Sequence, residues 1–348
     1  MLIYFGHTKF ALKNLQSRRR REGNMIRIIY MGTPLFAVPA LEALIENARS
    51  GQVVPEGYEI VTVITCIDKP AGRGKEIVYS PVKQVALSHG IPVWQPGSLK
   101  RPENIEALAA YHADLYIVAA FGQILPQGVL DQPHYGTLNI HASLLPKYRG
   151  VSPIPAAILQ GDKETGVTIM LIDAGVDTGP TLLKRSIPIA EDDTTGSLTL
   201  KLAELGARAL LEVLPLWVQG KITPQPQDEQ LASYTRMLRK EDGEIDWNRP
   251  AAELARAVRA YTPWPSAYTY WRGRLLKIIS AHAVGLEPGE EVKPGTVSLR
   301  KENGEQVLSV VTGNGLLVVD NLQLEGRKAM SAGEFVRGYP HILGDVLG

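Results

Sequence analysis

The stretch MIRIIYMGTP, residues 25–34, has the pattern of a buried strand that turns directly into a helix. Its core, Ile26–Met31, is a short apolar run rich in β-branched residues, and Gly32 and Pro34 supply the turn. Apolar residues then recur at helical spacing to about Ala48. Because consecutive apolar residues bury both faces of a strand, this stretch predicts a parallel sheet that is covered by helices.

The same alternation of strands and helices continues to residue 219. Further strands are expected at residues 60–67, 114–119, 136–141, 166–172 and 180–189, and helices at residues 81–88 and 195–219. The pattern predicts an α/β domain at residues 25–219, with a mostly parallel sheet and helices on both faces.

The chain changes character after this domain. Residues 220–230 contain Pro224 and Pro226 and are expected to form a linker. Beyond them, a short helix is expected at residues 250–260, and short strands at residues 267–270, 275–280, 306–311 and 315–319. Turn residues separate these strands, so residues 231–348 predict a small antiparallel barrel.

The composition is that of a globular protein. The 348 residues are enough for about two domains, and the 45% hydrophobic and 21% charged residues exclude a mostly disordered or fibrous chain. A single cysteine, Cys66, excludes a disulfide scaffold and a thiolate-rich metal site. No apolar stretch approaches the roughly 18–20 residues that cross a bilayer. The net charge of +1 indicates no particular partner.

Residues 1–24 carry six cations and one acid, a net charge of +5. They lack the continuous apolar centre of a secretory signal. An organelle-targeting segment and a basic nucleic-acid arm both remain open. We favour a disordered extension, because Met25 opens the first clear strand.

The strongest chemical signal is the pair Asn139 and His141. Residues two apart on a strand share a face, so these side chains are expected to project together while Ile140 enters the core. An amide donor beside an imidazole is suited to a developing oxyanion, and histidine exchanges protons near neutral pH. The alternative is that both only satisfy buried hydrogen bonds. The residues that follow, SLLPKYRG at 143–150, favour a site.

A carboxylate for this pair is expected from the glycine-rich loop at residues 173–179. Asp177 lies 36 residues beyond His141, a separation that one helix and one strand can bridge. A carboxylate that touches an imidazole fixes its tautomer, whereas Asp173 is expected to form an Asx-turn. No serine or cysteine lies in a nucleophile elbow and no His-Glu-x-x-His occurs. The set therefore favours group transfer between two bound substrates over covalent or metal-assisted hydrolysis.

Two basic regions are candidates for phosphate contacts. The loop at residues 68–75 places Lys69, Arg73 and Lys75 at the carboxyl end of a strand, where open α/β sheets bind ligands. Residues 236–277 hold nine cations and five acids with aromatic residues between them, which indicates a local nucleic-acid patch including Arg256 and Arg259. The alternatives are a solvated loop in the first case, and barrel core with a solvated face in the second.

Several motifs together resemble one enzyme family. Residues 137–150, TLNIHASLLPKYRG, are similar to the signature of the folate-dependent formyltransferases, and residues 166–170 and 177–179 continue the match. Further stretches resemble the members of that family that act on a charged tRNA: MGTPLFA at 31–37, KPAGRGK at 69–75, SPVK at 80–83, IDW at 245–247, AYTPWP at 260–265 and KAM at 328–330. The resemblance runs from residue 25 to the end.

This resemblance implies a Rossmann-like catalytic domain followed by a small OB-like β-barrel. It implies transfer of formyl from 10-formyltetrahydrofolate to the amino group of methionine on initiator tRNA. By motif matching, Asn139, His141 and Asp177 are catalytic. The folate-binding residues would be Ser143, Leu144, Leu145, Pro146, Phe121 and Gly122, and the tRNA-binding residues Lys69, Arg73, Lys75, Arg256 and Arg259. We expect a cytoplasmic monomer that uses no metal and binds no membrane.

Three rival functions are weighed against this one. A formyltransferase for a small amine would share the three catalytic residues but would need neither the basic loop nor the barrel. A non-catalytic RNA-binding protein would leave those residues without a role. A nicotinamide dehydrogenase would need the glycine fingerprint that the turn at Thr33 lacks, and this turn is expected to be structural.

Overall fold

The computed structural model describes residues 25–50, 54, 57–71, 76–285, 293–302 and 304–348. The predicted N-terminal extension and the candidates Arg73 and Lys75 lie outside these residues. The chain divides into two compact units. The first comprises the described residues up to Gly150 with 166–187 and 199–234, and the second comprises 151–165, 188–198 and 235–348. The units are described separately below.

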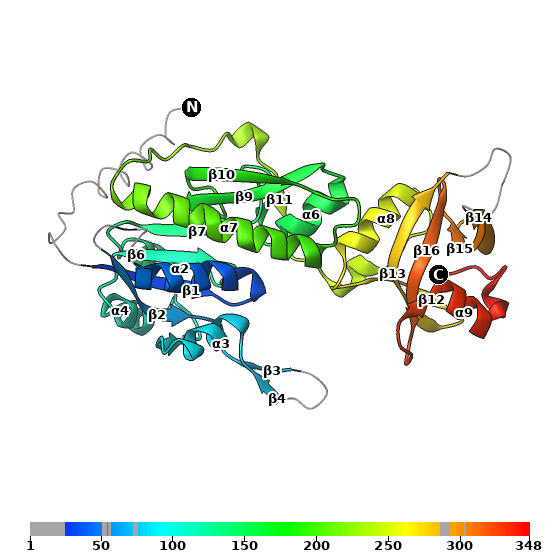
Figure 1. Cartoon of the computed structure of the whole chain (residues 1–348), viewed down its shortest axis with the longest axis horizontal. Helices are drawn as coiled ribbons and strands as arrows, with labels where there is room; N and C mark the ends of the chain where they lie inside the picture. Colours follow the sequence, from blue (N-terminus) through cyan, green and yellow to red (C-terminus); the bar gives the residue numbers. More distant parts are fainter. Residues whose placement is uncertain (1–24, 51–53, 55–56, 72–75, 286–292, 303) are drawn as a thin grey trace. The chain divides into compact units, whose positions relative to one another are not determined.

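A seven-stranded sheet forms the centre of the first unit (Figure 1), in the order β10-β9-β7-β6-β1-β2-β5. Its strands are β1 (Ile26–Gly32), β2 (Tyr58–Ile64), β5 (Val93–Trp94), β6 (Leu115–Ala119), β7 (Thr137–His141), β9 (Glu164–Leu171) and β10 (Thr181–Pro188). The pairs β1–β2, β1–β6, β2–β5 and β6–β7 are parallel, and β9 runs antiparallel to β7. The predicted mostly parallel sheet is therefore confirmed.

Helices cover both faces of this sheet, as predicted. They are α2 (Val38–Ser50), α3 (Pro81–Ser88), α4 (Pro102–Ala109), α5 (Gln127–Leu130) and α7 (Thr195–Val218). On one face, Ile29 and Met31 share a core cluster with Leu108 of α4 and Val129 of α5. On the other, α2 and α7 lie across the strands in Figure 1, and the Tyr30 hydroxyl donates to the carbonyl of Ala37, which precedes α2.

Two elements near the predicted basic loop and signature differ from the expectation. Residues expected to form only a loop include a short antiparallel hairpin, β3 (Lys69–Ala71) with β4 (Glu76–Val78). The helix that follows the signature, α6 (Pro153–Gln160), is anticipated from the sequence only as one helix somewhere between His141 and Asp177. It begins with proline at its first position, where no intrahelical N–H bond is lost.

The second unit is built on an antiparallel sheet in the order β12-β13-β16-β15-β14, with β17 paired to β16. Its strands are β12 (Ala267–Trp271), β13 (Arg274–Val284), β14 (Val297–Glu302), β15 (Glu305–Val311), β16 (Leu316–Leu324) and β17 (Met330–Ser331), with helices α8 (Ala251–Ala260) and α9 (Ala332–Gly338). Side chains from the sheet and both helices bury one core, including Leu254, Leu317 and Phe335. The prediction of a separate, small, barrel-like antiparallel unit is confirmed.

No helix in the part of the chain that the structure describes has both the length and the apolar character needed to cross a bilayer.

Candidate active site

Asn139 and His141 lie at the carboxyl end of β7, between β6 and β9. As the alternation predicts, both side chains project to the same side of the sheet, where both contact Asp177. Between them, Ile140 is 3% exposed, and α7 packs against it where Gly206 leaves space. The histidine is almost fully buried and the asparagine is half-buried. The core therefore fixes the backbone that presents this pair.

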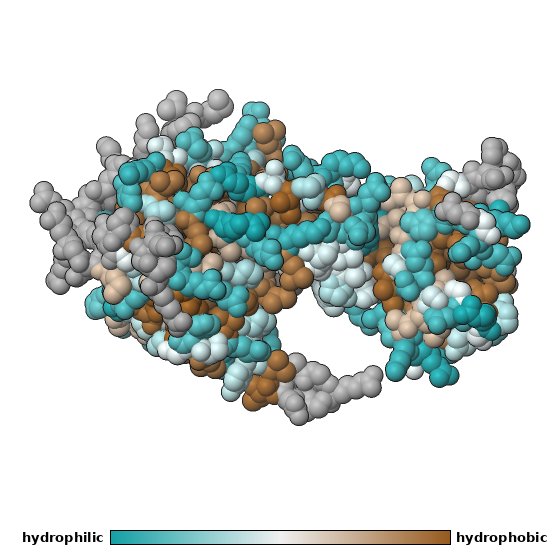
Figure 2. All heavy atoms as spheres, viewed as in Figure 1, coloured by the Kyte–Doolittle hydropathy of each residue, from teal (hydrophilic) through white to brown (hydrophobic). Residues whose placement is uncertain are grey.

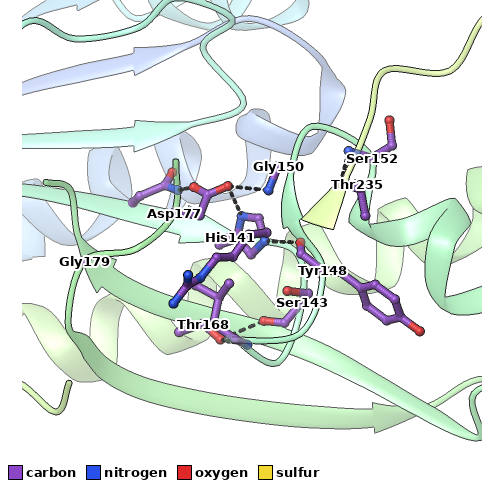
Figure 3. Close-up of polar contacts among 12 residues, drawn as sticks. His141, Ser143, Tyr148, Gly150, Ser152, Thr168, Asp177, Gly179 and Thr235 are labelled. Carbon is purple, nitrogen blue, oxygen red and sulfur yellow. Dashed lines mark hydrogen bonds and ion pairs between the residues drawn. The ribbon is translucent and has the colours of Figure 1, made fainter. Parts of the chain in front are cut away.

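Asp177 reaches the pair from the loop between β9 and β10, as the sequence predicted (Figure 3). Its Oδ1 lies 3.5 Å from Asn139 Nδ2, and its Oδ2 lies 3.6 Å from His141 Nδ1. The amide of Gly150 donates to the same Oδ2 over 2.8 Å. In the same loop, Asp173 accepts from the Gly175 amide over 3.0 Å, which confirms the predicted Asx-turn. One carboxylate thus faces both predicted donors.

The two ring nitrogens of His141 have different surroundings. Nε2 lies 3.0 Å from the carbonyl oxygen of Tyr148, a distance for a full hydrogen bond. Nδ1 faces Asp177 at a distance longer than such a bond. The Asn139 amide contact is also at the long limit. Because the Tyr148 carbonyl only accepts, Nε2 carries a proton, and Nδ1 is a donor only in the imidazolium form. The Asn139 amide and such an imidazolium can each bond an atom placed beside Asp177.

The predicted folate-binding stretch at residues 143–146 is a tightly bonded loop. The Ser143 hydroxyl donates to the Lys147 carbonyl over 2.6 Å. Thr168 bridges the loop to β9, since its hydroxyl accepts from the Leu145 amide and donates to the Ser143 carbonyl. Ser143 and Leu145 are each 1% exposed, whereas Leu144 and Pro146 are half-buried. The buried pair therefore shapes the loop, whereas Leu144 lies over Gly166 of β9.

Phe121 and Gly122, the other predicted folate residues, follow β6. Phe121 is buried, and its carbonyl accepts from the hydroxyl of Thr33 and the thiol of Cys66. Gly122 is exposed and lines an open cavity of about 320 Å³ together with Gly97, Ser98, Lys100, Gln123 and Ile124. This volume lies at the lower end of the usual range for small-molecule sites. Thr33 joins the ends of strands, which confirms its expected structural role.

The basic hairpin has a well-defined base. Lys69 is exposed at the start of β3, and just before it Asp68 pairs with Lys83 and accepts from Gln95. Burial acts to raise the pKa of Asp68, but the bonds from Lys83 and Gln95 outweigh it, so this pKa is lowered. Ile77 and Val78 of β4 and Tyr79, which follows it, are all exposed. A hydrophobic patch appears at the position of β4 in Figure 2.

Arg256 and Arg259, the predicted tRNA residues of the second unit, lie on α8 and are half-buried. The Arg256 Nε donates to the carbonyl of Leu159 at the end of α6 over 3.0 Å. A guanidinium nitrogen of Arg259 donates to the carbonyl of Asp193 over 2.9 Å. Burial and the like charge of Arg256 lower the pKa of Arg259. Both side chains therefore join segments within their unit, so reversing their charge would test folding as well as tRNA contact.

Sequence reasoning missed two residues close to the site. Arg149 is fully buried, and Gln227 donates two hydrogen bonds to the loop that carries Asp177. Arg149 had a signal, because it lies in the signature and an arginine is rarely buried without a partner. Gln227 had none, because it lies in a polar, proline-rich stretch that was expected to be a linker.

Among the described residues, no three histidine, cysteine, aspartate or glutamate side chains gather as a metal site would require.

This fold and site define the formyl transferase class, and family models support it. The model described as formyl transferase matches residues 26–214, and the model for the formyl transferase C-terminal domain matches residues 237–340. A curated methionyl-tRNA formyltransferase from Roseiflexus sp. is 46% identical over 93% of this chain and 95% of its own. The methionyl-tRNA formyltransferase of Marinobacter nauticus is 46% identical over 91% of this chain and 98% of its own. The chain therefore belongs to the methionyl-tRNA formyltransferase family.

A solved structure gives a further comparison of the fold. HypX from Aquifex aeolicus, in complex with tetrahydrofolic acid, is similar with a TM-score of 0.57 at 19% identity. The match covers 90% of this chain and 47% of that one.

Proposed function

We propose that this protein transfers the formyl group of 10-formyltetrahydrofolate to the amino group of methionine on initiator tRNA. One observation carries the proposal: Asn139, His141 and Asp177 meet at the carboxyl end of β7, in a chain that matches methionyl-tRNA formyltransferases over most of its length. Formyl-folate is a substrate of this reaction, and the open cavity at Gly122 lies after β6, the strand next to β7.

The chemistry is an acyl transfer that needs donors for one oxyanion. The methionine nitrogen attacks the formyl carbon, a C–N bond forms, and the carbonyl electron pair moves onto oxygen. Asn139 Nδ2 and His141 Nδ1 are the two donors that face one side of the site, and they would hold this oxygen. The tetrahedral intermediate then expels the folate nitrogen, which takes up a proton, while the methionine nitrogen loses one.

Asp177 has two tasks in this mechanism. Its negative charge lies beside Nδ1, where it would stabilise the imidazolium that donates to the oxyanion. The Gly150 amide holds the same carboxylate oxygen, so the carboxylate is fixed before the substrates bind. Nε2 of His141 is held by the Tyr148 carbonyl, which fixes the ring plane.

The proposal includes the tRNA contacts. Lys69 with Arg73 and Lys75 would meet phosphates of the acceptor end, and Arg256 and Arg259 would add charge in the second unit. Contacts to phosphate provide affinity without reading bases. We also propose that the protein acts as a monomer in the cytoplasm, where translation takes place.

The test is a panel of acceptors. The protein is incubated with labelled formyl-folate and with charged initiator tRNA, charged elongator tRNA or small amines such as an amino-sugar nucleotide. Label is expected chiefly on the methionine of initiator tRNA. Label chiefly on a small amine would contradict the proposal and favour the first rival, and tRNA binding without transfer would favour the RNA-binding rival.

A further inference from the structure

The segment at residues 221–234, which connects α7 to the rest of the chain, packs against the catalytic elements of the first unit. Near its start, Gln225 and Thr181 exchange two backbone hydrogen bonds of 2.8 Å each. Near its end, the Ser233 carbonyl accepts from the Arg149 amide over 2.8 Å, and its amide donates to the Pro146 carbonyl. Both ends are therefore fixed on elements that border the site.

Gln227 lies between these two anchors and reaches the loop of Asp177. Its side-chain nitrogen donates to the carbonyl oxygen of Asp177 over 2.8 Å and to that of Gly179 over 2.7 Å. Its side-chain oxygen accepts from Nε of Arg149 over 3.0 Å. A primary amide has two N–H donors, and here both are committed to the backbone of one loop.

This loop needs such support, because Asp177 has an unfavourable backbone conformation. Its φ angle is +52°, in the left-handed region that residues with side chains rarely adopt. Conformations of this kind persist where the surrounding structure holds them in place. The bridge from Gln227 across the carbonyls of residues 177 and 179 does this, and it also sets the direction in which the carboxylate projects.

Arg149 fixes Gln227 in turn. Its guanidinium is fully buried, and two of its nitrogens bind the two carboxylate oxygens of Glu229 over 2.9 and 2.7 Å. The Tyr234 hydroxyl accepts a further bond from it. A buried charge is tolerated when it is paired in this way. Arg149 also precedes Gly150, whose amide binds the Asp177 carboxylate. Both supports of Asp177 thus meet at one arginine.

We propose that Gln227 is a positioning residue for the catalytic carboxylate. The inference rests on the proposed function, because it takes Asp177 to act in formyl transfer. Gln227 would act by holding the loop in place. Asn139 and His141 lie 3.5 and 3.6 Å from the Asp177 carboxylate, so a shift of the loop changes both distances. A misplacement of about 1 Å can cost roughly a hundredfold in rate.

The test replaces the amide and separates turnover from substrate binding. Gln227→Glu keeps an oxygen for Arg149 but places a second oxygen against two carbonyl oxygens. Gln227→Met keeps the length and removes every hydrogen bond. The matched control is Gln225→Glu in the same segment, whose exposed side chain donates to the Thr223 carbonyl. We expect kcat to fall about 30- to 100-fold for both Gln227 variants, with KM for formyl-folate and charged tRNA within twofold, and no change for the control.

A second measurement asks whether Gln227 acts through Asp177. In the Asp177→Asn background, single-turnover rates should differ less than twofold with and without Gln227→Glu, because the group it positions is already impaired. A structural role alone would reduce the rate in both backgrounds equally. Thermal unfolding and tRNA affinity are measured for every variant. If Gln227→Glu does not fold, the rates with and without Asp177→Asn are compared for Gln227→Met and Glu229→Gln instead. Glu229→Gln weakens the ion pair that holds Arg149 without changing the loop of Asp177.

The outcomes separate this inference from the proposed function. If kcat of both Gln227 variants stays within twofold of the unmodified protein, if only KM changes, or if the loss persists unchanged in the Asp177→Asn background, the inference is wrong. The proposed function still stands in those cases as long as the unmodified protein formylates charged tRNA and Asp177→Asn is impaired. No transfer by the unmodified protein would refute the proposed function and this inference together.

Discussion

Asn139 and His141 are the two oxyanion donors of the proposed mechanism, and their removal gives the most direct prediction. The side chain of each ends beside Asp177, so each variant removes one donor without opening the core beneath Ile140. Loss of one oxyanion donor costs about 10²–10³ in rate. We expect Asn139→Ala and His141→Ala each to lower kcat by this factor while the Kd for initiator tRNA changes less than twofold.

The control for this pair is His89→Ala, a substitution of an exposed histidine at the end of α3. Rates come from the labelled-formyl assay and Kd values from a binding titration of charged tRNA. Normal turnover in either Asn139→Ala or His141→Ala would refute the assignment of that residue.

Among single residues of the candidate site, those whose positions follow from local periodicity or turn composition could be predicted from the sequence. The spacing of Asn139 and His141 placed them on one face of a strand, and the glycines around Asp177 indicated a tight loop that could approach them. Gln227 could not be predicted, because the carbonyls that it binds belong to residues 48 and 50 positions away. The side chains that bind the buried Arg149 are likewise remote in sequence, and no periodicity relates them to it.

Among the elements, the contact between α7 and β7 leads to a test of packing. A Cβ added at Gly206 would lie 2.7 Å from Ile140 Cγ2, a distance that the buried isoleucine cannot accommodate without moving. We expect Gly206→Val to lower the free energy of unfolding by about 1–3 kcal/mol and to reduce kcat, because Ile140 lies between the two donors.

The matched rescue is Ile140→Ala, which returns the volume that valine takes. The double variant Gly206→Val with Ile140→Ala is expected to be more stable than the sum of the two single effects, as double-mutant cycles show for residues in contact. Denaturant unfolding measures all three. Strict additivity would mean that the two residues do not compete for the same space.

Three strands of the second unit meet at a charged cluster that predicts a pH dependence. His282 of β13 contacts Glu302 of β14 and Asp320 of β16 over 3.0 and 3.3 Å. Burial acts to lower the pKa of His282, but the two carboxylates outweigh it and raise this pKa above 6.5. The stabilisation is therefore complete below about pH 6.5 and is lost as the pH rises through the higher folded-state value.

The measurement compares the unmodified protein with His282→Gln by thermal unfolding at pH 6 and pH 9. Because the cluster is about half exposed, we expect a Tm difference of about 1–3 °C at pH 6 that shrinks at pH 9. His89→Gln, whose histidine contacts a hydroxyl and a carbonyl, serves as the control. A difference that grows toward pH 9 would contradict the sign of the shift.

Element prediction succeeded where one signal dominated. The apolar runs of β1, interrupted by Arg27, and of β6 identified buried strands. The helix expected at residues 81–88 is α3, and Ser80 before it accepts from the Lys83 amide. It failed for short elements with mixed signals. The hairpin of β3 and β4 is rich in glycine and charge, and α9 is short, although its capping box of Ser331 and Glu334 is visible in the sequence.

For the whole molecule, the compact units are not continuous in sequence. Residues 151–165 and 188–198 belong to the second unit, although they lie between segments of the first. The change in composition near residue 220 marks where the antiparallel strands begin, and a boundary drawn from composition assumes continuous domains. Contacts such as that of Arg256 with Leu159 join residues about a hundred positions apart. Sequence patterning therefore predicts the number and class of the units better than the assignment of each segment to one of them.

The charge of the whole molecule determines how it can bind RNA. The net charge of the chain is +1, so long-range attraction to a polyanion is weak and binding must depend on local cations. We therefore expect log Kd for initiator tRNA to rise linearly with the logarithm of the salt concentration. Each phosphate contact is expected to add about 0.7–0.9 to the slope of this line. Lys69→Ala should reduce that slope by nearly one and leave kcat at saturating tRNA unchanged, because Lys69 is exposed on β3 whereas the proposed catalytic residues lie on β7 and in the β9–β10 loop.

The control for this prediction is Arg208→Ala, which removes an exposed cation from α7. Its slope should equal that of the unmodified protein. Equal slopes for all three proteins would show that Lys69 neutralises no phosphate. A slope that falls equally in both variants would show that tRNA senses only the total charge of the molecule, and the local patch on the hairpin would then have no role in binding.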